Sequence, residues 1–457
     1  MAEVRPLRGI RFTQAAGPMG SLIAPPYHTI GEEQRKRLAA RSPRNIVHLD
    51  LPEGGPERYR TAAEKLEAWA RDGFLAQERS PALYLYRQTF QTPDARMITR
   101  TGFLGLLRLE GEGGGVLHHE RMLPLPLEDR LRLIRATRTQ LSPVFVLYSD
   151  PEAGATRALE AGAARDRPGP RPFAPGLTAR RATELSPGTV QEFTDDEGVR
   201  HWLLPVTDEQ RIAEVQRVLA SRSLLIVDGR HRYRAALEYR DRMRSAFGLD
   251  DPELPESFVL TCFVRMEDPG LVVLPAHRVV KAMPGKDRRD KASIVGALFD
   301  RFDIESMEIP PGAHAAPILA PTRQEPGKKV VIGARFAGDP RLHVLRLREG
   351  EEPFAGRALD EPLRALDVAV LHRLILEPEF GIDEASAGAE GRLLYESDAA
   401  SAAAMVEKGK AAAAFFLRPV PIPALFDLAA RGMRLPLEST VFTPKIGSGL
   451  VLYRLGV

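Results

Sequence analysis

The chain has a single cysteine, Cys262, among its 457 residues, and no run of apolar residues long enough to cross a membrane. One thiol cannot form an intrachain disulfide, which favours a reducing compartment. A membrane-spanning helix needs roughly 18 or more consecutive apolar residues. The opening segment MAEVRPLRGIRF also lacks the apolar stretch of a signal peptide. We therefore expect a cytoplasmic protein without a membrane partner, in which Cys262 is a buried small apolar residue.

Several motifs of common enzyme classes are also absent from the sequence. One cysteine cannot build a thiolate zinc cluster, and no H-E-x-x-H pattern occurs. There is no Walker loop and no G-x-G-x-x-G loop. The GSG at 447–449 lacks the strand-to-helix context of a hydrolase nucleophile. These absences argue against the zinc, P-loop, dinucleotide-binding and α/β-hydrolase classes.

Lysine is scarce, since only ten of the 64 basic residues are lysine and arginine supplies the rest. This excess reflects either genomic base composition or a need for bidentate anion contacts. The formal net charge is +3, and no basic block stands out that would act as a nucleic-acid tail. Nucleic acid is therefore an unfavoured partner, and direct DNA binding ranks third among the functional hypotheses.

The length and the pattern of apolar segments predict two α/β (α+β) domains. A chain of 457 residues exceeds one hydrophobic core. Short apolar runs alternate with amphipathic helical stretches in both halves. The charged stretch GKDRRDKAS predicts a boundary near residue 285, which divides the chain into an N-terminal domain, 1–285, and a smaller C-terminal domain, 286–457. Residues 151–190, rich in Ala, Gly, Pro and Arg, are predicted to form a surface excursion.

The strongest functional signal is the segment LLIVDGRHRY at 224–233. It predicts a buried strand that ends at Asp228, a tight turn at Gly229, and a helix that begins with Arg230, His231 and Arg232. Cationic side chains are unfavourable at a helix N-terminus, which already carries about half a positive charge. A bound phosphate reverses the sign of that effect. We interpret the turn as an anion site, and a structural ion-pair cluster is the alternative.

Other polar residues in the sequence are candidates for binding or catalysis, each with a structural alternative. His119 and Glu120 could supply a general base or form a solvated turn. Tyr27 and His28 lie in the rigid turn APPYHTI, which could line a pocket or only precede a helix. The remaining candidates for substrate contacts are Arg130, on an amphipathic helix, the pair His277 and Arg278 between apolar strand pieces, and Lys445, for which a surface position is the better interpretation.

Eight motifs in order resemble one family of bacteria and archaea, the domain of unknown function 1015. They are APPYHTI, HE at 119–120, EDRL, SPVFVLYSD, VDGRHRYRAAL, MEDPGLVVLPAHR, LDVAVLHRLILEPEFGI and STVFTPKIGSGLV. The resemblance runs from about Arg5 to Leu455. The family name carries no activity. The chain departs from the usual family pattern in two places: Arg230 stands where the family usually has His, and His28 stands where it usually has Asp.

The turn is also similar, more distantly, to the phosphate-binding turn of the ParB and sulfiredoxin superfamily. That resemblance implies a mixed α/β core with insertions, in which Gly229, His231 and Arg232, with Arg230 and Tyr233 beside them, hold phosphate. It further implies that Asp228 binds a metal or a substrate hydroxyl and that Glu120 is the general base. Arg230 can still bind phosphate but cannot shuttle protons at neutral pH. Sulfiredoxin's catalytic cysteine has no counterpart, because Cys262 lies in a strand far from the turn in sequence.

The leading hypothesis is a phosphotransferase that acts on a small hydroxylated metabolite, such as serine. A nucleotide or pyrophosphate would be the donor and Mg²⁺ the metal cofactor. Asp228 would be the metal ligand, while His119, Glu120 and His231 would supply the acid–base chemistry. The alternative is a nucleotide-binding regulatory or scaffold protein without turnover. The sequence leaves the donor, the acceptor and a homodimeric state open.

Overall fold

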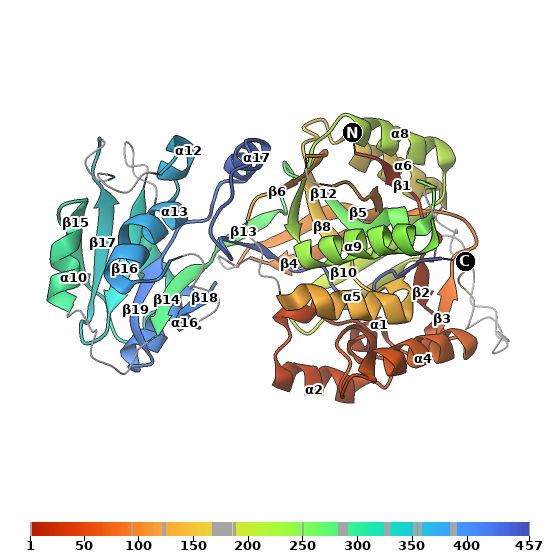
Figure 1. The fold of residues 1–457 in the computed structure, drawn as a ribbon, viewed down its shortest axis with the longest axis horizontal. Coiled ribbons are helices and arrows are strands. Elements are labelled where there is room, and N and C mark those ends of the chain that lie inside the picture. The colour runs from red at the N-terminus through yellow and green to blue at the C-terminus, as the bar shows by residue number, and fades with distance from the viewer. Residues whose placement is uncertain are drawn as a thin grey trace. The chain divides into compact units, whose positions relative to one another are not determined.

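The computed structural model divides the chain into two compact units. Unit 1 comprises Met1–His118, Pro124–Val272 and Pro444–Val457, and unit 2 comprises His119–Leu123 and Val273–Thr443. Each unit combines helices with a sheet, which confirms the predicted α/β class (Figure 1). The structure describes residues 2–92, 95–111, 113–120, 125–166, 185, 189–248, 251–281, 291–323, 330–350, 354, 359–383 and 391–456.

Unit 1 is built on a nine-stranded mixed sheet with the order β6-β11-β8-β12-β5-β4-β10-β9, to which β1 adds by pairing with β5. The pairs β11 with β6 and β12 with β8 are parallel. The other neighbours are antiparallel. The strands are β1 (Val4–Arg5), β4 (Leu83–Gln91), β5 (Met97–Arg108), β6 (Val116–His118), β8 (Val144–Tyr148), β9 (Gln191–Thr194), β10 (Arg200–Val206), β11 (Leu224–Asp228) and β12 (Phe258–Arg265).

Helices cover this sheet because its central strands are apolar on both faces. Every residue of β11, LLIVD, is buried. On α8 (Glu209–Ala220), Ile212, Val215 and Leu219 recur at helical spacing and pack with the strands and with α6 (Gly154–Asp166) in one core. The helices α5 (Leu125–Thr137) and α9 (Arg230–Phe247) lie side by side in the same unit (Figure 1).

The N-terminal helices of unit 1 form a second core around Phe12, Leu66 and Trp69. Their sequences carry the apolar periodicity that the predicted α/β alternation requires, as in α4, where Tyr59, Ala62, Leu66 and Trp69 are buried. The remaining elements of unit 1 are β2 (Ile10–Phe12), η1 (Gln14–Ala16), α1 (Met19–Leu22), η2 (Tyr27–Thr29), α2 (Glu32–Arg41), α3 (Val47–Asp50), α4 (Arg58–Arg71), β3 (Leu75–Gln77), β7 (Thr139–Gln140), η3 (Pro255–Ser257) and β21 (Tyr453–Arg454).

The last residues of the chain pack in unit 1, which differs from the predicted division into 1–285 and 286–457. The backbone of Leu452 pairs with that of Ile10, and β21 pairs with β7. Leu450, Val451 and Leu452 are each 0% exposed, so their burial explains the return of the chain to unit 1. The predicted boundary near residue 285 and part of the predicted excursion at 151–190 lie outside the described residues.

Unit 2 contains an antiparallel six-stranded sheet with the order β15-β17-β16-β19-β14-β18. The helix α16 packs on this sheet through Ala402, Ala403 and Val406. The elements are β13 (Val272–Pro275), β14 (His277–Lys281), α10 (Lys291–Leu298), β15 (Phe302–Glu308), α11 (Ala315–Leu319), η4 (Ala320–Thr322), β16 (Val331–Phe336), β17 (Arg341–Leu347), α12 (Glu361–Arg364), α13 (Asp367–Leu371), η6 (His372–Leu376), α14 (Glu377–Phe380), β18 (Leu393–Glu396), α16 (Ala399–Glu407), β19 (Ala411–Phe416), α17 (Ile422–Ala430) and β20 (Thr440–Thr443).

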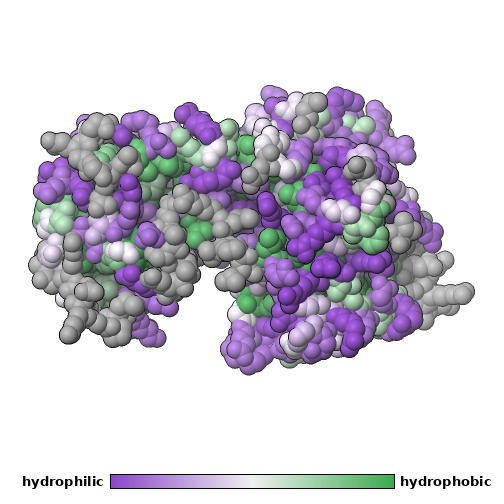
Figure 2. All heavy atoms as spheres, viewed as in Figure 1, coloured by the Kyte–Doolittle hydropathy of each residue, from purple (hydrophilic) through white to green (hydrophobic). Residues whose placement is uncertain are grey.

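The visible surface of unit 1 is mainly polar where α5 and α9 lie. Hydrophilic side chains dominate that face (Figure 2). Within the described ranges, no helix combines the length and the apolar character that a membrane span requires.

We expect the substitution Leu452→Ala to lower the free energy of unfolding of unit 1 by about 2–5 kcal/mol, the usual cost of a cavity in a packed core. Both tryptophans of the chain, Trp69 and Trp202, lie in unit 1, so urea unfolding followed by tryptophan fluorescence reports on this unit. Met97→Ala is the matched control, because Met97 is 63% exposed. An unchanged tryptophan transition in the Leu452 variant would contradict the assignment of residues 444–457 to unit 1.

Candidate functional site

The predicted strand–turn–helix at 224–233 is present in unit 1. The strand β11 ends at Asp228, Gly229 forms the turn, and α9 begins at Arg230. Gly229 has a φ of 83°, in the left-handed region that favours glycine. A Cβ atom at this position would also lie 2.9 Å from the Nε and Nη2 atoms of Arg232. The turn therefore requires glycine for its backbone conformation and for the close approach of the Arg232 guanidinium.

Three side chains from separate segments converge on the carboxylate of Asp228. The Nζ atom of Lys445 lies 3.1 Å from Oδ2. On the other carboxylate oxygen, Oδ1, the Nε2 atom of His28 lies at 3.4 Å and the Nη2 atom of Arg232 at 3.5 Å. The side chains of Asp228 and Arg232 are 8% and 10% exposed, so the carboxylate itself is largely removed from water, whereas Lys445 and His28 are partly exposed. The structure thus brings together four of the predicted site residues.

The environment of the cluster shifts the proton affinities of its members. Burial alone would raise the pKa of Asp228, but Lys445, His28 and Arg232 outweigh it, and the pKa lies well below the usual value. Burial lowers the pKa of His28 to about 4, although Asp228 opposes the shift. Burial, with Arg230 and Arg232, also lowers the pKa of His231. At neutral pH, Asp228 is therefore ionised and both histidines are uncharged.

The first turn of α9 carries buried side-chain nitrogen atoms without a hydrogen-bond partner among the described residues. The first backbone N–H groups of a helix have no partner within the helix. The N-cap of α9 is Gly229, which makes no side-chain cap. The side chain of Arg232 is only 10% exposed, yet its Nε and Nη1 groups find no acceptor in the part of the chain that the structure describes. Nδ1 of His231, whose role as donor or acceptor depends on the tautomer, also has no partner there. The Arg232 donors lie where the sequence predicts an anion.

Tyr27 and Arg130 support the loop that carries His28. The guanidinium of Arg130 lies 3.9 Å from the ring centre of Tyr27. Arg130 is 5% exposed and is paired with Asp50, at 3.0 Å from Oδ1, and with Asp129, at 2.5 Å from Oδ2. Ser448 donates a hydrogen bond of 2.7 Å to the other oxygen of Asp50. The charge of Arg130, predicted to contact substrate, is therefore neutralised by two carboxylates.

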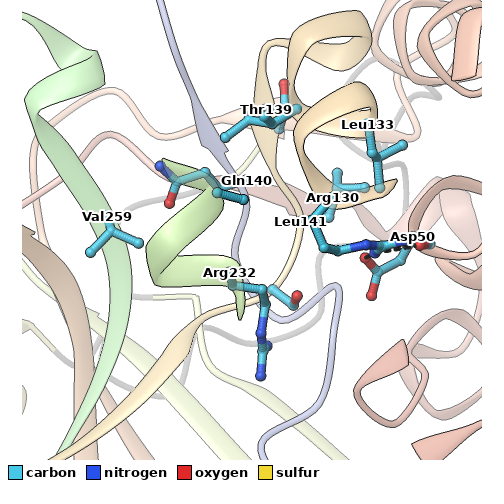
Figure 3. A pocket seen from close by; sticks show the side chains of 11 residues that line it. Asp50, Arg130, Leu133, Thr139, Gln140, Leu141, Arg232 and Val259 are labelled. Atoms are coloured by element: carbon cyan, nitrogen blue, oxygen red, sulfur yellow. Dashed lines mark hydrogen bonds and ion pairs between the residues drawn. The ribbon is translucent and has the colours of Figure 1, made fainter. Parts of the chain in front are cut away.

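The small cavity beside Arg130 and Arg232 is shown in Figure 3. It has a volume of about 50 Å³. That is the space of one or two water molecules, since each takes roughly 30 Å³ in the liquid. In the figure, the guanidinium of Arg232 extends away from Thr139 and Gln140, whereas Arg130 is directed at Asp50. This cavity is too small for a nucleotide, and neither Asp228 nor Lys445 lines it.

Tyr233 does not join the Asp228 cluster. It is 2% exposed, and its hydroxyl donates to the carbonyl oxygen of Glu110 and accepts from the N–H of the same residue, each at 2.9 Å. Burial raises its pKa to about 12. The phosphate contact predicted for Tyr233 is thus replaced by an anchor between α9 and the loop before β6.

The structure places His119 and Glu120 in unit 2. Their side chains are 1% and 3% exposed. One oxygen of Glu120 accepts hydrogen bonds from the backbone N–H groups of Ser439 and Thr440, each at 3.1 Å, and from the Thr440 hydroxyl at 2.9 Å. Nε2 of His119 lies 3.0 Å from the same hydroxyl. The predicted general base therefore holds the loop before β20 in unit 2.

His277 and Arg278, at the start of β14, are also in unit 2 and are both 0% exposed. Nδ1 of His277 accepts a hydrogen bond of 3.1 Å from the N–H of Leu417. Burial lowers the pKa of His277 to about 4. Arg278 donates to the carbonyl oxygens of Ala276, Leu437 and Glu438, each at 2.8 Å. The alternative of an internally satisfied buried pair describes Arg278 better than a substrate contact.

Sequence reasoning missed a cavity of about 180 Å³ that Lys445 lines together with Thr29. An apolar side of this cavity includes Ile23 and Leu38, and an acidic side includes Asp195 and Glu197. His201 also lines it and is held between Asp195, at 2.9 Å, and the hydroxyl of Tyr86, at 2.6 Å. No local motif marks these residues, because they come from segments that meet only in the folded chain.

The residues around Asp228 do not fit a protein-held Mg²⁺ ion. Magnesium prefers oxygen ligands, usually one or two carboxylates. Asp228 is the only carboxylate in the cluster that we describe, and both of its oxygens face nitrogen atoms of His28, Arg232 and Lys445. Within the described ranges, no group of three or more His, Cys, Asp or Glu side chains is placed to hold a metal ion. The donor set suits an anion better than a cation.

We expect unit 1 to lose stability as the pH falls from about 6.5 toward about 4, because His28 and His231 are uncharged in the fold and take up protons once unfolded. The groups that face His28 are Asp228, Arg232, Lys445 and His231. The pKa of each histidine is lower in the fold than in the unfolded chain, so this contribution to stability is complete above pH 6.5 and is lost at lower pH.

The substitution His28→Gln should lower the number of protons taken up on unfolding by less than one. Solvent screens the interactions of the His28 side chain, which is 37% exposed. Urea unfolding from pH 4 to pH 8, followed by tryptophan fluorescence, checks this. An unchanged slope in the variant would contradict a lowered pKa of His28 in the fold.

Comparison with known proteins places the chain in a family. A family model described as "Protein of unknown function (DUF1015)" matches residues 4–170 and 177–369. No curated protein matches the chain.

Among solved structures, a free serine kinase in complex with AMP is 13% identical, with 74% of this chain and 87% of that chain covered and a TM-score of 0.33. A conserved hypothetical protein from Pyrococcus furiosus is 13% identical, with 75% and 92% covered and a TM-score of 0.32. SbnI from Staphylococcus aureus, with a C-terminal truncation, is 12% identical, with 75% and 84% covered and a TM-score of 0.33. Because the family model spans most of the sequence, the chain belongs to the DUF1015 family of proteins of unknown function.

Proposed function

We propose that the turn at 228–232 binds the phosphate groups of a nucleotide or of pyrophosphate, and that the chain transfers a phosphoryl group to a small hydroxylated metabolite. The observation that carries the proposal is Arg232. This side chain is 10% exposed, lies in the first turn of a helix whose N-cap residue is glycine, and keeps two buried N–H groups without an acceptor in the described structure. A phosphate would accept these hydrogen bonds and those of the helix N-terminus.

The charge of the cluster supports an anionic ligand. Arg232 and Lys445 face the single negative charge of Asp228. Arg230 adds its positive charge in the first turn of α9, where the helix dipole is also positive. His28 and His231 are uncharged at neutral pH because their pKa values are lowered. Arg232 and Lys445 therefore place an excess of positive charge around a buried carboxylate, and a phosphate group would neutralise it.

The cavity next to Lys445 suits a small acceptor. Its volume of about 180 Å³ is several times the roughly 30 Å³ of a water molecule and lies below the roughly 300–1,000 Å³ of drug-sized sites. A metabolite of the size of serine would fit, and a complete nucleotide would not. Lys445 lines this cavity and contacts Asp228, so it joins the acceptor cavity to the phosphate turn. The donor would lie over the turn itself.

The geometry supports His28 as the proton acceptor in the transfer. Nε2 of His28 faces the carboxylate of Asp228, so the neutral ring carries its proton on Nε2 and offers Nδ1 as a base. A carboxylate that orients an imidazole in this way is a recurring arrangement for general-base catalysis. In the transfer, the donor P–O bond breaks, the acceptor oxygen bonds to phosphorus, and the hydroxyl proton passes to Nδ1 of His28. The sequence predicts Glu120 as the general base, so Glu120 and His28 are the two candidates for this role.

The similarity of the turn to the ParB and sulfiredoxin superfamily is part of the same proposal. It rests on Gly229, His231 and Arg232, which lie in the turn and the first helical turn of α9. A nucleotide-binding regulatory protein without turnover would use the same residues. The two functions differ in whether a phosphorylated product forms.

We expect Arg232→Gln to weaken the binding of ADP or pyrophosphate by about 10- to 100-fold, because charge-assisted hydrogen bonds contribute about 1.5–3 kcal/mol. Isothermal titration calorimetry measures the loss. Arg242→Gln is the matched control on the same helix, since Arg242 is exposed and pairs with Glu238 at 2.9 Å. Equal affinity in the Arg232 variant and the wild type would contradict the proposed anion site.

We expect His28→Ala to keep ligand binding but to lower the rate of phosphoryl transfer by about 10²–10⁴-fold, the usual contribution of a general base. Phosphorus NMR of the protein with serine, Mg²⁺ and ATP, ADP or pyrophosphate follows the product. Added imidazole should restore part of the rate, which a merely structural role of His28 would not allow. His314→Gln in unit 2 is the matched histidine control.

Loss of turnover in Glu120→Gln, with turnover unaffected in His28→Ala, would assign the general base to Glu120. Binding without turnover by the wild type would favour the regulatory function.

A further inference from the structure

The helical segment from Asp367 to Phe380 in unit 2 contains a π-helical turn. It runs through α13, η6 (His372–Leu376) and α14, and the N–H of Glu377 bonds to the carbonyl oxygen of His372, five residues earlier. Pro378 supplies a local cause, because proline has no N–H to bond to the carbonyl oxygen of Leu374. That oxygen accepts instead from Nη1 of Arg301, at 3.2 Å. Turns of this kind are rare and are frequently found at functional sites.

The first residue of this turn, His372, has a defined hydrogen-bonding state. Its Nε2 atom lies 3.1 Å from Nε of Arg278, which can only donate. Nε2 is therefore an acceptor, and the neutral ring carries its proton on Nδ1. Burial, with Arg278, lowers the pKa of His372 well below its usual value, which keeps the ring neutral. His372 is 5% exposed, and in the described structure Nδ1 has no hydrogen-bond partner.

Arg278 holds this ring in place. Its guanidinium is 0% exposed and donates to three backbone carbonyl oxygens. The ring of Tyr395 lies 4.6 Å from it. Because these contacts fix Arg278, its Nε–H fixes the tautomer of His372. The N–H of Nδ1 is then a buried donor, which destabilises the fold unless a partner satisfies it.

His372 lines a cavity of about 260 Å³ in unit 2. Leu363 and Ile382 give the cavity apolar walls. Two arginines also line it: Arg373 is neutralised by Glu377, at 2.7 Å, whereas the hydrogen bond of Arg434 goes to the carbonyl oxygen of Met433. Asp383, at the exposed rim, has interactions of its own. Among the described residues, no carboxylate pairs with Arg434. The lining thus offers one cation without a carboxylate partner, beside an apolar wall.

We infer that this cavity is a second ligand site, which binds a small molecule with one carboxylate group and an apolar body. The carboxylate would pair with Arg434 and accept a hydrogen bond from the N–H at Nδ1 of His372. A single cation matches a single negative charge better than a phosphate dianion, and the leucine and isoleucine side chains match a short hydrocarbon chain. The site is independent of the phosphate turn, because all the residues that carry it belong to unit 2.

Binding of hexanoate to the full-length protein, measured by isothermal titration calorimetry, tests the site. Hexan-1-ol removes the charge and keeps the chain, and inorganic phosphate supplies an anion without an apolar body. We expect hexanoate to bind and both other probes to bind much more weakly. Equal binding of hexan-1-ol, or binding of phosphate alone, would overturn the inference, as would the absence of hexanoate binding at millimolar concentrations.

Two variants locate the binding. Arg434→Gln should weaken hexanoate binding by about tenfold or more, since it removes a charge-assisted hydrogen bond. Arg431→Gln is the matched control, because Arg431 is exposed and pairs with Asp427 at 3.0 Å. Arg232→Gln should leave hexanoate binding unchanged and so separates this site from the proposed phosphate site. Equal losses in the Arg434 and Arg431 variants would overturn the inference.

The tautomer of His372 provides a second measurement that does not depend on a ligand. Long-range ¹H–¹⁵N NMR spectra of the wild type, assigned by comparison with His372→Gln, should show the proton on Nδ1 from pH 6 to pH 8. Hexanoate should then shift the Nδ1 resonance. A proton on Nε2 would overturn the assigned hydrogen-bond direction and with it the role of His372.

Discussion

The attraction between one buried carboxylate and the nitrogen atoms around it organises the candidate site. Asp228 ends a strand whose residues are all buried, so its charge cannot be solvated by water alone. Arg232, one helical turn further along the same segment, and Lys445 and His28, from two distant segments, replace that solvation. The same arrangement creates the excess of positive charge that suits a phosphate. Removing any one of these groups would change the pKa of Asp228, because all three lower it and they interact in a region of low dielectric constant.

The local part of the site was predictable from the sequence. A buried strand, a glycine and a helix that begins with cations have recognisable patterns, and the structure contains each of them at 224–233. The apolar face of α8 was predictable for the same reason, since helical periodicity is a local property. The family resemblance is also confirmed by the family model. What these features share is that neighbouring residues in the sequence determine them.

Contacts between distant segments were not predictable from local patterns. Lys445 was expected at the surface, because nothing in its neighbourhood marks it as a partner of Asp228. Tyr233 was assigned to phosphate, but its hydroxyl bonds to the backbone of Glu110, which precedes it by more than a hundred residues. The last residues were assigned to the C-terminal domain, although the burial of Leu452 places them in unit 1. Long-range packing decides such positions, and one sequence carries no direct signal of it.

The return of residues 444–457 to unit 1 has a consequence for the synthesis of the protein. A ribosome makes Asp228 and the turn long before it makes Lys445, so the newly made N-terminal part holds Asp228 without the ammonium group that lies 3.1 Å from it in the finished fold. The cluster around Asp228 is assembled only after residues 444–457 have been made and Leu452 has paired with Ile10. A chain that a protease cuts before residue 444 would then lack the ammonium group of Lys445, and the carboxylate of Asp228 would keep only His28 and Arg232 beside it.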